Sequence, residues 1–432
     1  MQDQQEKSPI SALGLLIWGL AAFFFLYEFF LRTFIGSVAH QVIHDLRLNA
    51  ETFAILGSAY YIAYGVMQVP VGILVDKFGV KLIMTFAILV CAAATLLFAH
   101  SAGFSAALIS RMLMGFGSSF AFVCLLVIAV TWFPKRYFAF FAGTSQFIGT
   151  LGPLLAGGPL IAVMSKYHQD WRTTLSEIAL FGFLLAAAVF LVVRNKPRGG
   201  EQALVYLQTE IPLSTRLWRL AKNRQAWFVA LYSATSYVSI SLLGAIWGTE
   251  YLQAVGLSQP VAASIISLTW FAYGISCPLL GALSDIAKRR KPVLLLCATI
   301  GLIATSVITF LPLHHTWAYA IAFFGLGIAA SGQNVGFAAI AEHVDIATRA
   351  SALGLNNGAM TLFASFIPPL ASFFISHSAG TNPLLVRDNF TLGFSIMPLL
   401  YCTAIVIAWL FIKETYCKPQ QEAIVLNPTL NE

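Results

Sequence analysis

The sequence predicts an all-α membrane protein whose twelve transmembrane helices form two pseudo-symmetric six-helix bundles. Of the 432 residues, 58% are hydrophobic and only 10% are charged, and the mean hydropathy is +0.79. A soluble domain carries about 25% charged residues, so most of this surface must face lipid. The apolar residues fall in long runs that one long loop divides six and six, which predicts the two bundles.

Each apolar run is long enough to cross a bilayer, which takes about 20 helical residues. The predicted spans are 12–38, 51–75, 80–100, 104–132, 137–164, 173–194, 225–254, 259–286, 292–312, 315–341, 349–377 and 391–413. The one long connection, 195–224, contains RNKPRGG and RLWRLAKNR. It predicts an N-terminal bundle at 1–195, a cytoplasmic linker at 196–224 and a C-terminal bundle at 225–432 with a short cytoplasmic tail.

Lysine and arginine are distributed unequally between the two sets of loops. With both termini in the cytoplasm, 19 of the 25 lie in cytoplasmic segments. The outer loops hold Arg47, Lys166, Arg172 and Arg387. Because basic residues favour the cytoplasmic side, this bias predicts that both ends are cytoplasmic. It also accounts for the net charge of +7 without a nucleic-acid partner, and the stretch 216–224 is suited to lie on an anionic leaflet.

Signals of metal binding and catalysis are weak. The six cysteines form no CxxC pair and are expected to be packing residues rather than disulfides or ligands. His40 and His44 have the spacing of a metal or pH-sensing pair, but no third ligand is evident, which favours ordinary surface histidines. Walker, G-x-S-x-G, HExxH and dinucleotide motifs are missing from the sequence. We therefore expect no metal, no cofactor and no enzymatic activity.

A repeated loop closes the second and the eighth predicted spans. GILVDKFGVK at 72–81 and GALSDIAKRRKP at 281–292 both read G-x-L-x-D followed by basic residues. The acid and the bases suit a latch that forms in one state of the protein and breaks in another, although a solvated basic turn is the plainer alternative. The repeat favours the latch. Its predicted residues are Gly72, Asp76, Gly79, Lys81, Gly281, Asp285 and Arg289.

These loops resemble those of the major facilitator superfamily. The segment 72–81 is similar to its G-x-L-x-D-R-x-G-R-K signature, with Lys77 in the usual arginine place. RMLMGFGSS, with Arg111, Gly115 and Gly117, is similar to R-x-x-x-G-x-G, and GTLGPLLAGGP at 149–159 is similar to the G-P-x-x-G-G pattern associated with antiporters.

The resemblance covers about residues 11 to 415. FFFLYEFFLR, GFGSSFAF and WFPKRYFAFFAG also resemble a bacterial branch that includes phagosomal importers of amino acids or nucleosides. The internal repeat predicts alternating access about a site near the bilayer midplane, for which a monomer suffices. The resemblance to this branch implies the bacterial inner membrane. Pro153, Pro159, Pro368 and Pro369 fall in equivalent spans of the two halves, where they are suited to kink gating helices.

Charges inside spans indicate function, because each costs about 2.5–3.5 kcal/mol on insertion scales. Glu28 lies deep in the first span, Arg32 lies one turn later on the same face, and Arg111 lies in the fourth span. The resemblance implies that both spans line the cavity, so we predict a proton-coupling and substrate cluster of these three residues. A permanent pair that only joins helices is the alternative. The surplus positive charge favours an anionic group on the substrate, unless Asp170, Glu177 or Glu250 compensates.

Aromatic and amide side chains in other spans are candidates for the cavity wall. Buried amides need partners, and mid-span amides either join helices or bind solute. The predicted set is Tyr27, Tyr60, Tyr64, Gln68, Gln146, Tyr232, Tyr237, Trp270, Tyr273, Gln333, Asn334, Asn356 and Asn357.

The leading functional prediction is proton-coupled uptake of a small polar metabolite, such as an amino acid, a nucleoside or an organic acid. Its expected partners are this small molecule, protons and membrane lipids. The pattern at 149–159 favours a proton antiporter that exports a drug or siderophore as the alternative. A membrane sensor that transports nothing is the third hypothesis.

Overall fold

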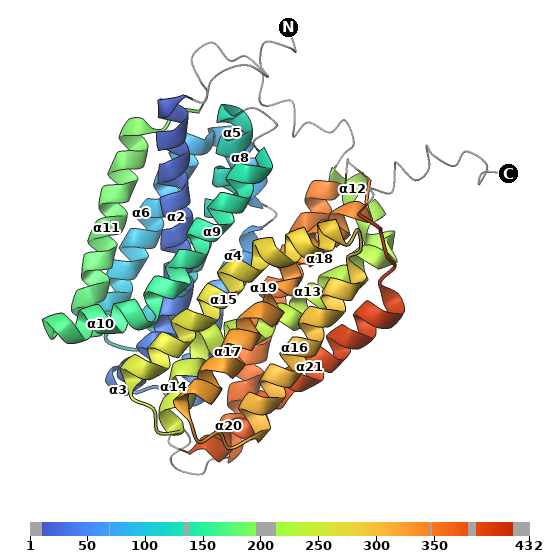
Figure 1. Ribbon diagram of the computed structural model, residues 1–432. Coiled ribbons are helices and arrows are strands. Elements are labelled where there is room, and N and C mark those ends of the chain that lie inside the picture. Colours follow the sequence, from blue (N-terminus) through green and yellow to red (C-terminus); the bar gives the residue numbers. More distant parts are fainter. Residues whose placement is uncertain are drawn as a thin grey trace, which may run out of the picture. The chain divides into compact units, whose positions relative to one another are not determined.

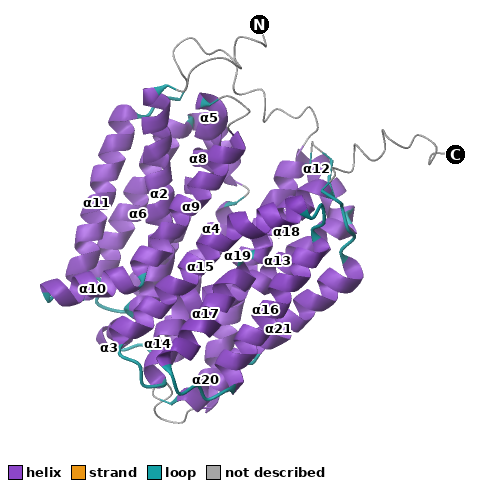
Figure 2. Cartoon of the chain, in the orientation of Figure 1, coloured by secondary structure: helices purple, strands orange, loops and turns teal. Residues whose placement is uncertain are grey.

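The computed structural model describes residues 11–68, 70–133, 138–195, 213–345, 348–378 and 386–417. Helices make up most of these ranges, which contain no β-strand (Figure 2). Each of the twelve predicted spans coincides with one helix or with consecutive helices. By length and hydropathy, ten described helical stretches can cross a membrane, and the bent pair α9–α10 makes an eleventh. The remaining predicted span, 51–75, is formed by α4 and α5.

The described helices fall into two compact units (Figure 1). Unit 1 consists of Met1–Gln208, Ala245–Gln253 and Ser258–Ser267. Its helices are α2 (Ala12–Ser37), α3 (Ala39–Asp45), α4 (Ala50–Met67), α5 (Pro70–Phe78), α6 (Val80–Ala99), α7 (Phe104–Ser118), α8 (Ala121–Trp132), α9 (Phe138–Ala156), α10 (Gly158–Tyr167), α11 (Trp171–Val192), the π-helix η3 (Leu243–Trp247) from Ala245 onward and most of α14 (Gly248–Ala254).

Unit 2 consists of Thr209–Gly244, Ala254–Leu257 and Leu268–Glu432. Its helices are α12 (Leu213–Lys222), α13 (Arg224–Leu242), α15 (Gln259–Ile286) from Leu268 onward, α16 (Lys291–Phe310), α17 (Thr316–Ala330), α18 (Gly332–Glu342), α19 (Arg349–Ser378), α20 (Arg387–Phe394), α21 (Ile396–Val406) and η5 (Ile407–Phe411).

Polar residues fix where several helices begin. The Ser11 hydroxyl accepts from the Gly14 backbone N–H at the start of α2. Asn49 and Thr52 form a reciprocal capping box at the start of α4. Asp170 caps α11, and Asn223 caps α13. Each cap satisfies a backbone donor that has no partner within its helix, and a lost cap typically costs about 1 kcal/mol.

Glycines allow close packing inside unit 1. A Cβ atom on Gly115 of α7 would overlap the carbonyl oxygen of Tyr60 in α4. A Cβ atom on Gly152 of α9 would likewise overlap the carbonyl oxygen of Leu26 in α2. The helices of each pair, α7 with α4 and α9 with α2, therefore pack closely at these glycines.

The fifth predicted span bends by 44° between Thr144–Ala156 and Gly158–Tyr167. The bend coincides with Gly157 and with Pro159 at the start of α10. The hydroxyl of Ser267, on the first part of α15, accepts from the Gly158 N–H at 2.7 Å and donates to the Leu154 carbonyl at 2.7 Å. Ser267 thus satisfies backbone groups on both sides of the bend.

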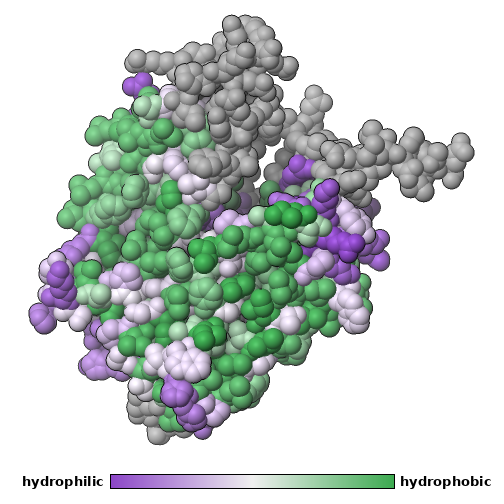
Figure 3. All heavy atoms as spheres, in the orientation of Figure 1, coloured by the Kyte–Doolittle hydropathy of each residue, from purple (hydrophilic) through white to green (hydrophobic). Residues whose placement is uncertain are grey.

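The surface of the helices is suited to lipid. Figure 3 shows hydrophobic residues along the sides of the helices and hydrophilic residues gathered toward their ends. Exposed side chains such as Leu191, Phe366 and Leu399 are at least 62% accessible. This surface, together with the apolar helices, defines a multi-pass membrane protein.

Candidate functional site

The centre of unit 1 contains an ion pair on a single helix. Glu28 is completely buried, and Arg32 is 8% exposed, one turn further along α2. One guanidinium nitrogen of Arg32, Nη2, lies 3.1 Å from both carboxylate oxygens of Glu28. The predicted i, i+4 pair is therefore formed within the described structure, where low dielectric strengthens the attraction between the two charges.

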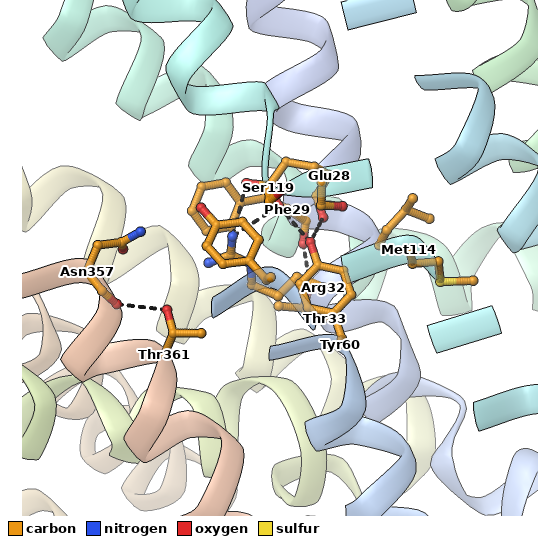
Figure 4. Close-up of polar contacts among 12 residues, drawn as sticks. Glu28, Phe29, Arg32, Thr33, Tyr60, Met114, Ser119, Asn357 and Thr361 are labelled. Atoms are coloured by element: carbon orange, nitrogen blue, oxygen red, sulfur yellow. Dashed lines mark hydrogen bonds and ion pairs between the residues drawn. The ribbon is translucent and has the colours of Figure 1, made fainter. Parts of the chain in front are cut away.

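Tyr60 completes the environment of the carboxylate from α4. Its hydroxyl donates to Oε2 of Glu28 at 2.8 Å and lies 3.2 Å from the Glu28 backbone carbonyl. Figure 4 shows the phenol and the Arg32 side chain meeting at Glu28. An ionised carboxylate with a guanidinium and a phenol as donors is well satisfied without water.

Arg111 joins this cluster through the backbone of α2. Its Nη1 donates to the Leu31 carbonyl at 2.6 Å, and its Nη2 lies 3.4 Å from the Arg32 carbonyl. No bond connects it to the carboxylate of Glu28. The structure thus brings the three predicted residues together, but Arg111 binds helix carbonyls while Arg32 alone pairs with the acid.

Aromatic rings surround both guanidinium groups. The Arg32 guanidinium carbon lies 4.3 Å from the Phe29 ring centroid and 4.6 Å from the Tyr64 centroid. The Arg111 guanidinium carbon lies 4.9 Å from the Tyr60 centroid. Cation–π contacts of this kind hold a charge where water is scarce.

The three acids considered as compensators are engaged elsewhere in unit 1. Asp170 caps α11 through Thr173, and Glu177 accepts from Gln169 at 2.7 Å. Glu250 lies 3.8 Å from the His40 ring. The cluster of Glu28, Arg32 and Arg111 therefore keeps its formal surplus of one positive charge.

The other candidates of unit 1 take different positions. Tyr64 stacks on Tyr60, with ring centroids 6.3 Å apart, and therefore extends the cluster. The Tyr27 side chain packs edge-on against the ring of Phe181 in α11. Gln68 ends α4 and bonds the Tyr64 carbonyl at 3.4 Å, while Gln146 is half-buried on α9.

Three candidates of unit 2, Gln333, Tyr273 and Asn334, form two polar contacts between helices. The Gln333 amide of α18 donates to the Tyr273 hydroxyl of α15 at 2.6 Å, and the ring of Trp270 lies beside Tyr273. The Asn334 amide bonds the Cys277 carbonyl of α15 at 3.3 Å. Tyr237 of α13 packs edge-on against Tyr273. These side chains join α13, α15 and α18.

The remaining candidates of unit 2 are Tyr232, which packs in the apolar core, and the polar residues Asn356 and Asn357 of α19. Tyr232 belongs to the apolar core and donates to the Leu294 carbonyl at 2.7 Å. Asn356 of α19 is fully buried, yet neither its amide nitrogen nor its amide oxygen has a hydrogen-bond partner among the described residues. Its neighbour Asn357 accepts from Thr361 through its backbone carbonyl at 2.7 Å (Figure 4). An unsatisfied buried amide is costly, so Asn356 is a candidate for solute contact.

The first predicted latch is partly described. Gly79 has a φ of +78° and directly precedes α6, as the predicted turn requires. The backbone N–H of Lys81 donates to the Asn195 amide oxygen at 2.9 Å, a partner that the sequence did not indicate. The side chain of Asp76 and the surroundings of Gly72 lie outside the described part of the structure.

In the second predicted latch, the basic partner is Arg290 rather than Arg289. Arg290 contacts Asp285 and Ser284, and its Nη2 lies 2.7 Å from Oε1 of Glu342. Lys288 has a φ of +51°, and this turn points Arg290 back toward α15 while Arg289 is exposed. Gly281 has open space around it, so close helix approach does not explain this glycine.

The C-terminal segment is attached to the second latch. The Glu414 carboxylate accepts from the backbone N–H groups of Arg290 and Lys291 at 2.8 and 3.0 Å. Thr415 donates to Glu342. Sequence reasoning missed Glu342, Glu414 and Asn195, because only the folded chain brings these distant residues to the two loops.

The described residues contain no group of three or more histidine, cysteine or acidic side chains that could hold a metal ion.

The family model of the Major Facilitator Superfamily matches residues 17–251 and 229–424. The chain belongs to the major facilitator superfamily. The two matches cover both halves, in agreement with two six-helix repeats. Members of this superfamily are membrane transporters rather than enzymes, so the polar cluster belongs to a transporter.

Similar proteins agree with this assignment. The chain is 24% identical over 367 residues to a probable L-galactonate transporter of Escherichia coli strain K12, covering 78% of each protein. It is 25% identical over 309 residues to a hexuronate transporter of Bacillus subtilis strain 168, covering 70% of each. The fold is similar to a crystal structure of the nucleoside transporter NupG, with a TM-score of 0.74, 14% identity and coverage of 91% and 99%.

Proposed function

We propose that this superfamily member takes up a small metabolite bearing a carboxylate, in symport with protons. The observation that carries the proposal is the charge of the buried cluster. Glu28 and Arg32 neutralise one another, while Arg111 donates to the backbone carbonyls of Leu31 and Arg32 and is not paired with an acid among the described residues. The cluster therefore has room for one additional negative charge.

The carboxylate of the substrate would bind Arg32. Arg32 is the more exposed of the two arginines, and it gives one nitrogen to both oxygens of Glu28. A planar guanidinium is suited to bind a carboxylate through two parallel hydrogen bonds. A substrate carboxylate would consequently compete with Glu28 for the same donor.

This competition would couple the substrate to a proton. A buried carboxylate that loses its arginine partner is costly as an ion, and protonation removes that cost. The proton on Glu28 would restore the charge balance that the substrate carboxylate disturbs. Substrate and proton would then enter together and leave together when the two halves alternate in access.

Two relatives support the substrate class, because L-galactonate and hexuronates are both sugar acids. The basic bias of the loops supports a chain whose two ends are cytoplasmic, in the bacterial inner membrane. We propose that the protein works as a monomer, that residues 196–224 link two halves, and that the predicted latches and cavity residues serve alternating access.

Uptake into proteoliposomes tests the function. A thermal-shift screen of sugar acids, organic acids, amino acids, nucleosides and neutral sugars on the purified protein selects the ligand. We expect sugar acids to raise the melting temperature and the matching neutral sugars to leave it unchanged. Labelled ligand should then accumulate only when the outside is more acidic than the lumen.

Glu28→Gln tests the coupling. We expect it to abolish accumulation driven by a proton gradient while exchange of labelled for unlabelled substrate continues. Glu177→Gln removes the same charge from an exposed position and should accumulate substrate normally. Accumulation by Glu28→Gln equal to that of the wild type would refute the proton role of Glu28.

Export by proton antiport is the alternative, and the pattern at 149–159 favoured it. In the structure, Gly157 and Gly158 of this pattern pack against Ser267 and Ser264 of α15. This packing role suits transport in either direction, so the pattern does not by itself favour export. Substrate movement against the proton flux in everted vesicles would establish the alternative.

A further inference from the structure

A basic hollow lies at the end of unit 2 where α12 meets α13. It has a volume of about 540 Å³, and its walls include the cations Arg219, Lys222, Arg224 and Lys413. Its lining, drawn from the described residues, contains no acidic side chain. In Figure 3 hydrophilic residues gather near the position that Figure 1 gives to α12.

Amide side chains build the hollow by bridging separate segments. Gln225 donates to the Phe411 carbonyl at 3.0 Å and accepts from the Lys413 N–H at 2.9 Å. Asn223 caps α13 and donates to the His343 carbonyl at 2.9 Å. These bonds hold Lys413, from the C-terminal segment, beside the start of α13, although Lys413 and Gln225 are 188 residues apart.

Among the described residues, Arg219 is the one cation of the hollow that forms an ion pair. Arg219 is paired with Asp345 at 3.5 Å, and that contact is half-exposed. The Glu414 carboxylate, which directly follows Lys413 in the chain, accepts from backbone N–H groups at the start of α16. Lys222 lies 4.6 Å from the centroid of the Trp218 ring, whereas Arg224 and Lys413 are exposed.

The hollow lies at the ends of two candidate membrane spans. The candidate span Arg224–Ala254 begins there, and the span Arg387–Phe411 ends there. Leu220 of α12 is buried in unit 2, while Leu217 and Trp218 are 44% and 62% exposed. A tryptophan beside bases on a short amphipathic helix is typical of the layer of lipid headgroups.

We propose that this hollow binds the phosphate headgroup of an anionic phospholipid. The phosphate would lie among Lys222, Arg224 and Lys413, and the acyl chains would pass over the first turns of α13, where Trp227 and Leu231 are 49% and 38% exposed. Clusters of bases at the ends of spans attract anionic headgroups through charge, and the hollow adds a shape that holds one of them. The site is independent of the Glu28 cluster and of the transported substrate.

Native mass spectrometry of the full chain tests the proposal. The protein is released from nanodiscs of phosphatidylcholine and phosphatidylglycerol, and the bound lipids are counted. We expect the wild type to retain phosphatidylglycerol preferentially and Lys222→Gln/Lys413→Gln to lose that preference by about tenfold or more. Lys222→Arg/Lys413→Arg, which keeps both charges, should restore it.

Two controls distinguish lipid binding in the hollow from a general effect of surface charge and from binding of free phosphate. Lys166→Gln/Lys288→Gln removes the same charge from exposed positions elsewhere and should retain phosphatidylglycerol like the wild type. Inorganic phosphate at matched concentration should not displace the lipid. Equal retention by Lys222→Gln/Lys413→Gln and the wild type, an equal loss in the control pair, or displacement by phosphate would each overturn the proposal.

Discussion

The hydroxyl of Tyr60 lies 2.8 Å from Oε2 of Glu28, so a single hydrogen bond connects the second span to the acid of the first. The same carboxylate is held by Arg32 from its own helix. Tyr60 therefore links the Glu28 carboxylate of α2 to α4. Protonation of Glu28 or the loss of its partner Arg32 would weaken or break this hydrogen bond and so change the packing of α4 against α2.

Tyr60→Phe should weaken both the fold and the coupling. It removes a hydrogen bond to a charged group, which is worth about 1.5–3 kcal/mol. We expect a lower free energy of unfolding in detergent and an altered pH dependence of proteoliposome uptake. Tyr232→Phe is the matched control, because its hydroxyl bonds only the neutral Leu294 carbonyl. That variant should lose about 1 kcal/mol and keep the pH profile of the wild type.

Gly115→Ala should separate α7 from α4. The added methyl would overlap the Tyr60 carbonyl oxygen, and forced overpacking costs about 1–3 kcal/mol. We expect a lower melting temperature and slower uptake, because Tyr60 would shift away from Glu28. Gly19→Ala places the same methyl on α2 with no neighbour within 4 Å, so its melting temperature should stay or rise. Equal destabilisation by Gly115→Ala and Gly19→Ala would show that overlap with the Tyr60 carbonyl is not the cause of the effect at Gly115.

The helices could be predicted from the sequence because lipid imposes a strong rule on it. Every buried backbone group must be satisfied internally, so long apolar runs must be helices. Within one helix the sequence also predicts neighbours, and the bond of Arg32 to Glu28 follows directly from i, i+4 spacing.

Contacts between distant segments could not be predicted in the same way. The sequence located Arg111 inside a span, but its two acceptors are backbone carbonyls 79 and 80 residues earlier, which no residue pattern encodes. The choice of Arg290 over Arg289 depends on a left-handed turn at Lys288, a residue type that rarely adopts it. Such details require the folded backbone.

Asn356→Leu should stabilise the protein and impair transport. The Asn356 amide is fully buried with no hydrogen-bond partner among the described residues, so an apolar residue of similar size removes an unsatisfied group worth about 1–3 kcal/mol. If the amide serves the substrate, uptake should fall several-fold while the melting temperature rises. Asn334→Leu is the control, because its amide is bonded to the Cys277 carbonyl, and that change should lower the melting temperature. If Asn356→Leu were less stable than the wild type, the Asn356 amide would have a hydrogen-bond partner in the membrane-embedded protein.

Ser267→Ala should destabilise the bend between α9 and α10. The partly buried Gly158 N–H would lose its acceptor, and the penalty of about 1–3 kcal/mol for a fully buried unpaired donor sets the upper limit of the cost. Ser264→Ala removes a hydroxyl that bonds only the Pro260 carbonyl of its own helix. We expect thermal unfolding in detergent to show a clear loss for the first variant and almost none for the second. Equal losses would mean that the hydrogen bonds of Ser267 to Gly158 and Leu154 do not stabilise the bend.

Asp45 should make the stability of unit 1 dependent on pH. The indole N–H of Trp171 donates to Oδ2 of Asp45 at 2.9 Å, and this bond, with a contact to His44, lowers the pKa of Asp45 below its ordinary value. The folded state therefore binds the proton less readily than the unfolded state does. The stabilisation is fully present above the ordinary carboxyl pKa of about 3.9 and is lost as the pH falls through the lower folded value.

The variant Asp45→Asn isolates this effect. Since the Asp45 side chain is 39% exposed, we expect the wild type to exceed the variant by less than about 1 kcal/mol at pH 5. The difference in melting temperature should shrink as the pH is lowered to about 3, because the wild-type carboxylate is then becoming protonated. Asp388→Asn changes an 85% exposed carboxylate and should show a small difference at both pH values. A difference for Asp45→Asn that stays constant or grows on acidification would show that the charge of Asp45 does not stabilise its bond to Trp171.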